Sequence, residues 1–319
     1  MTVTEEKPSQ SSREHAALQN ILVATDFSEP AQRALCKAVR IAGKHHSRLS
    51  VVHVLHPDRQ NAAFENPPEL DKERIAAEQQ LTGLVAAFEP GQAIATLLIK
   101  HGPVAEQVVS VIEQKGIDLL VIGTRGRGSL QTLALGSAAE ELLRIAPCPV
   151  MTVGPRVELG ADSVEDGFHT ILFATDFGRG SAKALPIALA LTRSQQGQLI
   201  LLHVLPPVPV PSASLSAYAP PAIAAGECEE YEAASHKSAL KKLKDFLPPH
   251  TGLAQEPKYV VGTDFLAEGI LLASAEFKAD LIVMGANRTV SPKIAAHLPW
   301  AAVHEVVRHA HCPVLTVVG

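Results

Sequence analysis

Short apolar runs alternate with segments of helical periodicity along the chain. In the first half, the runs rich in Val, Ile and Leu cover residues 21–25, 49–55, 95–100, 119–123 and 150–153. Their length and β-branched content are typical of strands buried on both faces of a parallel sheet. After the first run, Ser28 is placed to cap a helix, and positions 31, 35, 38, 39 and 42 form one apolar stripe. This alternation predicts an α/β fold with an open, doubly wound parallel sheet.

The pattern occurs twice. Four segments of the first half recur in the same order 150 to 164 residues later: ILVATDFS as ILFATDFG, LSVVHVLHP as LILLHVLPP, DLLVIGTRG as DLIVMGANR, and APCPVMTVG as AHCPVLTVV. Matched segments in a fixed order indicate a tandem duplication. We therefore expect a mobile N-terminal tail (1–19), a first domain (20–156), a linker (157–167) and a second domain (168–319), each domain with strand order 3-2-1-4-5. Pro186 falls within the first helix of the second domain, which should start late or kink.

Composition limits the classes of partner. The net charge of −5 and the pI near 6.3 argue against general binding to nucleic acid or to an anionic membrane. No apolar run approaches the roughly 18 residues that span a bilayer, and the N-terminus lacks the apolar core of a signal peptide. The four cysteines are far apart and form no metal or disulfide motif. A cytoplasmic protein is expected.

A glycine-rich segment, GTRGRGSLQTLALGS, runs from Gly123 to Ser137. It follows the fourth strand, while Asp26 follows the first, and in a 3-2-1-4-5 sheet these two strand ends flank the point where ligands bind. Glycines allow close approach of a phosphate, helix N–H groups at Ser137 can bind it, and Arg125 adds charge. Asp26 suits ribose hydroxyls or a phosphate-bound metal. The alternative is a structural turn, in which Ser137 and Glu140 form a capping box and use the same N–H groups.

These segments together resemble the universal stress proteins. The resemblance rests on ILVATDFS, on HVL in the second strand, on CPVMTV, and on the pattern G-x2-G-x9-G-S, and it covers both halves as a tandem arrangement. The pattern is that of the ATP-binding subgroup, and it is met in the first domain. The resemblance implies a site for ATP, with Mg²⁺, formed by Ala24, Thr25, Asp26, Val54, Gly123, Thr124, Arg125, Gly126, Gly136, Ser137 and Ala138. Adenine would lie near Val54, ribose near Asp26 and Gly123, and the phosphates on Gly126, Gly136, Ser137 and Ala138. At Ala24 ATP-binding members often carry proline.

The second domain resembles the family in fold but not in this site. Gly285 is present, but Arg288 replaces the second glycine, and Pro299-Trp300-Ala301 replaces Gly136-Ser137-Ala138. Proline lacks a donor N–H, and tryptophan fills the space of a phosphate. We expect the second domain to bind ATP weakly or not at all through this motif, while Arg288 and Lys293 remain candidates for another anion.

Other chemical motifs fail on spacing. In HEVVRH the histidines His304 and His309 are five residues apart, not the four that a zinc-binding helix needs, and no metal site is expected. The P-loop lysine is absent, and no nucleophile has a base beside it. His53, His203, Cys148 and Cys312 fall in or beside strands and are expected to be structural.

The function expected from the sequence is an ATP-binding stress-response protein that acts as a nucleotide-dependent binding or signalling module and is not an enzyme. The alternatives are a slow ATPase or phosphotransferase that uses the same pocket, and an ATP-free dimerising scaffold. Besides the adenine nucleotide, an unidentified protein partner is expected. The family pairs its final strands across a dimer, which predicts an internal pseudo-dimer of the two domains, with a homodimer of chains as a further expectation.

Overall fold

The computed structural model describes residues 18–55, 67–86, 94–124, 135–157, 167–207, 225–286 and 300–319. Their contacts divide the chain into two compact units. The N-terminal unit extends to Gly167 and also includes His311–Val318, whereas the C-terminal unit comprises Phe168–Ala310 and Gly319. Within the described ranges, no helix combines the length and the apolar character needed to cross a bilayer.

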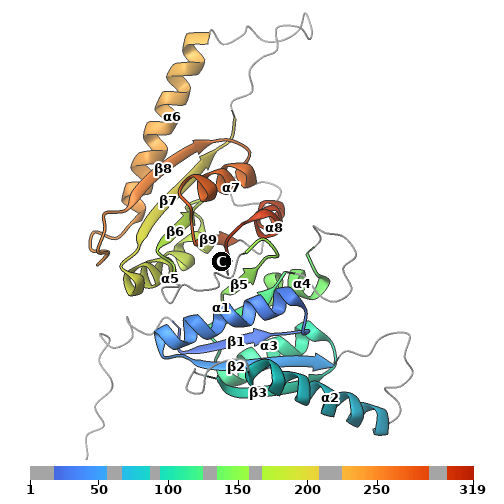
Figure 1. Ribbon diagram of the computed structural model, residues 1–319. Coiled ribbons are helices and arrows are strands. Elements are labelled where there is room, and N and C mark those ends of the chain that lie inside the picture. Colours follow the sequence, from blue (N-terminus) through green and yellow to red (C-terminus); the bar gives the residue numbers. More distant parts are fainter. Residues whose placement is uncertain are drawn as a thin grey trace, which may run out of the picture. The chain divides into compact units, whose positions relative to one another are not determined.

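The N-terminal unit contains five parallel strands in the order β3-β2-β1-β4-β5 (Figure 1). The strands are β1 (Asn20–Ala24), β2 (Arg48–Leu55), β3 (Ile94–His101), β4 (Leu119–Gly123) and β5 (Val150–Val153). The connecting helices are α1 (Glu29–His45), α2 (Pro67–Ala86), α3 (Val104–Lys115) and α4 (Ser137–Ile145). Class, strand order and parallel pairing are those predicted, and each strand agrees with its apolar run to within one residue at either end.

A sixth strand of this unit comes from the end of the chain. Strand β10 (Val314–Val318) pairs antiparallel with β5, so that Val314 lies opposite Thr152 and Thr316 opposite Val150. The Thr152 hydroxyl donates to the carbonyl oxygen of Val314 over 3.2 Å. The two final strands therefore pair as expected, and the contacts place β10 in the N-terminal unit although its segment belongs to the second sequence repeat.

The C-terminal unit repeats the first four strands as a parallel sheet in the order β8-β7-β6-β9. Its strands are β6 (Thr170–Ala174), β7 (Gln198–Leu205), β8 (Lys258–Thr263) and β9 (Leu281–Ala286). Its helices are α5 (Arg179–Gln195), α6 (Ala225–Phe246), α7 (Leu266–Glu276) and α8 (Trp300–His309). The duplication read from the sequence is thus present in the backbone.

The first helix of each unit shows how the sequence sets its start. Ser28 caps α1 by accepting from the N–H of Ala31, and the predicted apolar stripe of α1 is buried. Helix α5 begins at Arg179, the position that corresponds to the start of α1, and contains Pro186. The expected late start of α5 is therefore wrong. The helix already has its first turns when it reaches Pro186, and the missing N–H of this residue removes one hydrogen bond from the helix interior.

An aspartate joins the first strand to the fourth in both units, β1 to β4 in one and β6 to β9 in the other. In the N-terminal unit one carboxylate oxygen of Asp118 accepts from the N–H groups of Gln19 and Asn20, each over 2.8 Å. In the C-terminal unit Asp280 accepts from Thr170 over 2.8 Å. These bonds explain why each copy has an aspartate directly before its fourth strand, and they fix the register of the two strands that lead to the ligand end of the sheet.

Candidate nucleotide site

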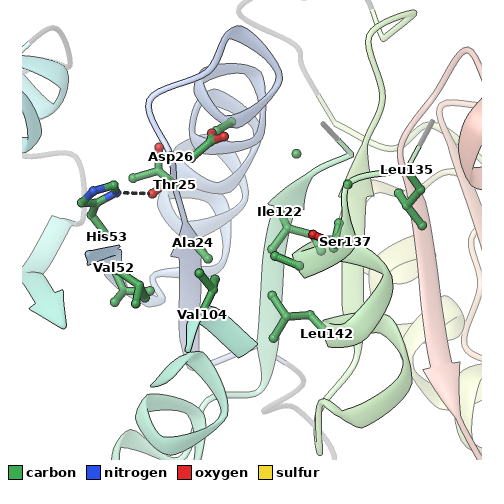
Figure 2. Close-up of a pocket in the computed structure, with 16 residues that line it drawn as sticks. Ala24, Thr25, Asp26, Val52, His53, Val104, Ile122, Leu135, Ser137 and Leu142 are labelled. Carbon is green, nitrogen blue, oxygen red and sulfur yellow. Dashed lines mark hydrogen bonds between the residues drawn. The ribbon is translucent and has the colours of Figure 1, made fainter. Parts of the chain in front are cut away.

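A cavity of about 470 Å³ opens at the carboxyl ends of β1 and β4. This is the point where the strand order reverses, since β1 pairs with β2 on one side and β4 on the other. Eight of the eleven residues predicted from the sequence line it: Ala24, Thr25, Asp26, Val54, Gly123, Gly136, Ser137 and Ala138. Residues more than 100 positions apart in the chain are thus brought to one cavity by the sheet topology (Figure 2).

Of the other three predicted residues, only Thr124 is described, and it is not among the described residues that line the cavity. Thr124 is 3% exposed at the end of β4, where its N–H donates to Val153 over 3.1 Å. Arg125 and Gly126 lie outside the described residues, as do Arg288, Lys293 and Pro299 of the second repeat.

The rim on the β1 side is a tight turn at Thr25, Asp26 and Phe27. Phe27 has a left-handed backbone with φ of 64°, and its N–H donates to the Thr25 hydroxyl over 3.1 Å. One oxygen of Asp26 accepts from the N–H of Ser28 over 3.0 Å. The turn orients the carboxylate of Asp26, which lines the cavity, since the N–H of Ser28 holds one of its oxygens.

His53 supports this turn from β2. Its Nδ1 lies 2.7 Å from the carbonyl oxygen of Thr25, and its ring centre is 4.4 Å from that of Phe27. A carbonyl only accepts, so Nδ1 carries the hydrogen, which fixes the tautomer. His53 also lines the cavity. It has the structural role expected, but the sequence analysis did not place it in the site.

The opposite rim is the start of α4. Gly136 is the N-cap, no side chain caps the helix, and the N–H of Gly136 donates to Thr124 over 2.9 Å. Ser137 is the first helical residue, and it lines the same cavity as Ile122 (Figure 2). Glu140 forms an ion pair with Arg144 at 3.1 Å. The alternative with a capping box is therefore wrong, because the helix begins at Ser137, one residue earlier than a box with Ser137 as the N-cap requires. Ser137, Ala138 and Ala139 present the first-turn N–H groups.

The floor of the cavity is apolar. It is formed by Val52 on β2, Ile122 on β4, Val104 at the start of α3 and Leu142 on α4. These residues were missed because each belongs to the core pattern of its own element, and only the tertiary arrangement exposes one face to the cavity. Among the described lining residues, Asp26 and His53 are the only ionisable side chains.

Gly123 is required by packing. A Cβ at this position would lie 2.7 Å from the backbone nitrogen of Ala31 in α1. In the C-terminal unit, a Cβ at Gly285 would lie 2.1 Å from the nitrogen of Ser181 in α5. Real Cβ atoms essentially never come this close to backbone, so both sites need glycine whether or not a ligand binds. The presence of Gly285 in the second copy has this structural reason.

The C-terminal unit has the same turn, but its aspartate accepts a hydrogen bond from a serine side chain of the same unit. Thr175, Phe177 and His203 repeat the turn and its histidine support, with His203 Nδ1 2.8 Å from the carbonyl oxygen of Thr175. The Ser181 hydroxyl donates to Asp176 over 2.7 Å, at the position where the first copy has Ala31. Helix α8 begins with Trp300, as α4 begins with Ser137.

The described residues contain no cluster of three or more His, Cys, Asp or Glu side chains that could hold a metal ion. His309, in the last turn of α8, lies 3.2 Å from the Glu305 carboxylate and 3.0 Å from the carbonyl oxygen of that residue. Cys148 and Cys312 are buried, as expected, and burial raises the pKa of the Cys148 thiol to about 12.

The sequence model described as the universal stress protein family matches the chain twice, over residues 17–154 and 167–318. The chain belongs to the universal stress protein family. The two matches make it a tandem member with two domains.

Known universal stress proteins match the chain over one domain in sequence and over nearly its full length in structure. A Thermus aquaticus relative, named as the universal stress protein in the QAH/OAS sulfhydrylase 3' region, is 33% identical over 135 residues, covering 42% of this chain and 98% of its own. The universal stress protein A homolog 1 of Coxiella burnetii is 33% identical over 141 residues, covering 42% and 95%. The crystal structure of a universal stress protein from Archaeoglobus fulgidus covers 93% of this chain and 97% of that one, with a TM-score of 0.60 and 16% identity. Likeness at that identity concerns the fold.

Proposed function

We propose that the cavity of the N-terminal unit binds ATP and that the protein is a nucleotide-dependent binding or signalling module of the stress response, not an enzyme. The observation that carries the proposal is the pairing of two rims across one cavity. One rim is the start of α4, which no side chain caps, and the other is the carboxylate of Asp26. Donors for phosphate and an acceptor for hydroxyls are what a nucleotide requires at its two polar parts.

The residues present fit this ligand. The volume of about 470 Å³ is in the range of small-molecule sites, and Val52, Val54 and Ile122 offer an apolar surface to a base. Asp26 would accept from ribose hydroxyls. The N–H groups of Ser137 and Ala138, with the Ser137 hydroxyl, would hold phosphate. Gly136 would contribute by having no side chain, since its own N–H is already bonded to Thr124.

Mg²⁺ would reach the site with the nucleotide, neutralising phosphate charge. Asp26 is the carboxylate among the described lining residues and is the candidate to help hold it. For hydrolysis, Asp26 and His53 are the titratable side chains among the described lining residues, and both are engaged by backbone groups of the β1 turn. This supports retention of ATP with slow turnover or none.

We propose that the C-terminal unit does not bind ATP in the equivalent place. Asp176 is bonded to Ser181, and Trp300 stands where Ser137 starts its helix. Bound ATP would then act by favouring one conformer or one partner-bound state of the chain, through tighter binding to that state.

Calorimetry of the full chain with MgATP tests the proposal, with one site per chain expected. Gly136→Val should abolish binding and leave the fold intact, because φ of −65° and ψ of 143° at this residue are accessible to valine. Ala301→Val is the control, because it places valine in the first turn of α8, the equivalent helix of the C-terminal unit, and it should bind like the parent. Two equivalent ATP sites per chain would contradict the proposed difference between the units. Unchanged ATP affinity in Gly136→Val would mean that the phosphates do not lie at the start of α4.

Measuring ATP hydrolysis distinguishes the binding module from a slow ATPase and from an ATP-free scaffold. Mass spectrometry of the nucleotide released from purified protein by heat, followed by phosphate release over hours, should give ATP and negligible product. ADP in stoichiometric excess over protein would favour a slow ATPase. A protein without nucleotide that binds none in calorimetry would favour the scaffold.

A further inference from the structure

In the described part of the C-terminal unit, most residues in the N-terminal half of helix α6 from Glu230 onward are exposed. The helix contacts β7 and β8, and its buried residues are Ala239 and Leu243. From Glu230 to Ser238 every residue is exposed except Ser235, which is half-buried, and Tyr231 is 65% exposed. Figure 1 shows α6 continuing well past the ends of β7 and β8. Isolated helical turns are marginal in water, so this half gains little from its own unit.

One stripe on this half has a pattern of its own. Glu230, Ala233, Ala234 and Lys237 are spaced i, i+3, i+4 and i+7, so they share one face of the helix. Glu230 and Lys237 are two turns apart, about 10 Å along the axis, too far to pair with each other. Among the described residues neither takes part in an ion pair. The stripe presents one acid, two small residues and one base in a line.

This order is self-complementary under a two-fold axis. If two α6 helices cross antiparallel between Ala233 and Ala234, Glu230 of each copy lies opposite Lys237 of the other. The alanines permit close approach of the two backbones at the centre. Tyr231 falls opposite His236 of the second copy, beside the stripe, where an aromatic ring adds contact area. Both ion pairs form at once because the interface is isologous.

The corresponding helix of the N-terminal unit lacks the stripe. Buried Ala77 and Leu81 of α2 match Ala239 and Leu243 of α6. At this offset exposed Asp71 and Lys72 stand in place of Ala233 and Ala234, and Ile75 stands in place of Lys237. Two charged side chains at the centre would prevent close approach. The stripe is therefore a feature of α6 and does not follow from the shared fold.

We propose that the Glu230–Lys237 stripe of α6 is a homodimerisation surface that docks antiparallel on the same stripe of a second copy of this chain. Two or three turns of each helix bury less than the roughly 1,200 Å² typical of stable complexes. The dimer is accordingly weak, and it loosens with salt because both ion pairs are at the surface. The surface is independent of the ATP site.

Sedimentation of the full chain over a range of concentrations at low salt tests this. Glu230→Lys and Lys237→Glu each replace two attractive contacts with two repulsive ones and should raise the dimer dissociation constant roughly tenfold. An equimolar mixture of the two variants should associate like the parent, since each introduced charge then meets its opposite. The double variant E230K/K237E should also associate like the parent.

Lys242→Glu is the matched control, because it reverses a charge on α6 about 120° away from Glu230 and should change nothing. Glu230→Gln, which only removes the attraction, should have an intermediate effect, and circular dichroism verifies that each variant is helical. The proposal is overturned if the parent stays monomeric, if the single reversals associate like the parent, or if the mixture associates no better than either variant alone.

Discussion

The Nδ1 atom of His53 lies 2.7 Å from the carbonyl oxygen of Thr25, which ties the second strand to the turn after the first. The C-terminal unit has the same bond, between His203 and Thr175 at 2.8 Å. In both units a phenylalanine of the turn adopts a left-handed backbone, with φ of 64° at Phe27 and 60° at Phe177. An unusual backbone of this kind persists only where its surroundings hold it, and the histidine is part of that support.

Replacing each histidine separates its structural role from its role in the cavity. His53→Phe and His203→Phe each remove one hydrogen bond to a carbonyl and should cost about 1 kcal/mol of stability, read as a lower urea midpoint for the affected unit. Only His53→Phe should weaken ATP binding, because only the first turn carries the proposed site. Equal loss of ATP affinity in both variants would contradict this division.

Gly123→Ala and Gly285→Ala should each destabilise their unit by about 1 to 3 kcal/mol through overpacking. The reason is the contact of the added Cβ with helix backbone, at 2.7 Å and 2.1 Å. Gly83→Ala is the control, because nothing lies within 4 Å of its Cβ and alanine favours the helix interior. Thermal unfolding with and without ATP measures the effect. A loss at Gly123 that appears only with ATP present would mean that the glycine serves the ligand.

Asp118→Ala should lower the stability of the N-terminal unit by about 2 kcal/mol, since it removes a charged acceptor from two backbone donors. Urea unfolding followed by far-UV circular dichroism measures this loss of stability. Asp71→Ala, on the exposed face of α2, should lie within about 0.5 kcal/mol of the parent. Equal stability of the two variants would show that the bonds of Asp118 to Gln19 and Asn20 contribute nothing net.

Cys148 should resist alkylation in the native protein. Burial raises its pKa to about 12, so at pH 8 only about one thiol in ten thousand is thiolate. Cys36 is half-exposed on α1 and should react with iodoacetamide before Cys148, although burial also raises its pKa. Peptide mass spectrometry after short labelling distinguishes the sites. In urea both should react, and rapid native labelling of Cys148 would show that β5 opens locally.

The apolar runs predicted the strands closely because each strand is buried on both faces, which leaves a contiguous signal in the sequence. The cavity rims at Asp26 and Ser137 were predicted because they follow strands whose order the fold determines. The sequence placed the start of α4 at Gly136-Ser137 but left open which of the two residues caps it, because both are acceptable caps. In the structure Gly136 is the N-cap, and its N–H donates to Thr124.

Residues of the cavity floor could not be predicted from their own segments. Val104 and Leu142 have the apolar character of any core position, and their place at the cavity depends on how α3 and α4 pack together. Gly123 was predicted as a site residue because glycine allows a ligand to approach the backbone, but packing also requires glycine there. The constraint on its side chain comes from α1, a helix nearly 100 residues earlier in the chain.

Strand β10 has a consequence for the order in which the protein is made. The hydroxyl of Thr152 and the carbonyl of Val314 that accepts from it are 162 residues apart. At 5 to 20 residues per second, synthesis of that interval takes roughly 8 to 32 seconds. Throughout this time the open edge of β5 has no β10 to cover it, which is when an unpaired strand edge is open to wrong partners. The edge of β5, although translated in the first half of the chain, is therefore covered only when the last residues of the chain have been made.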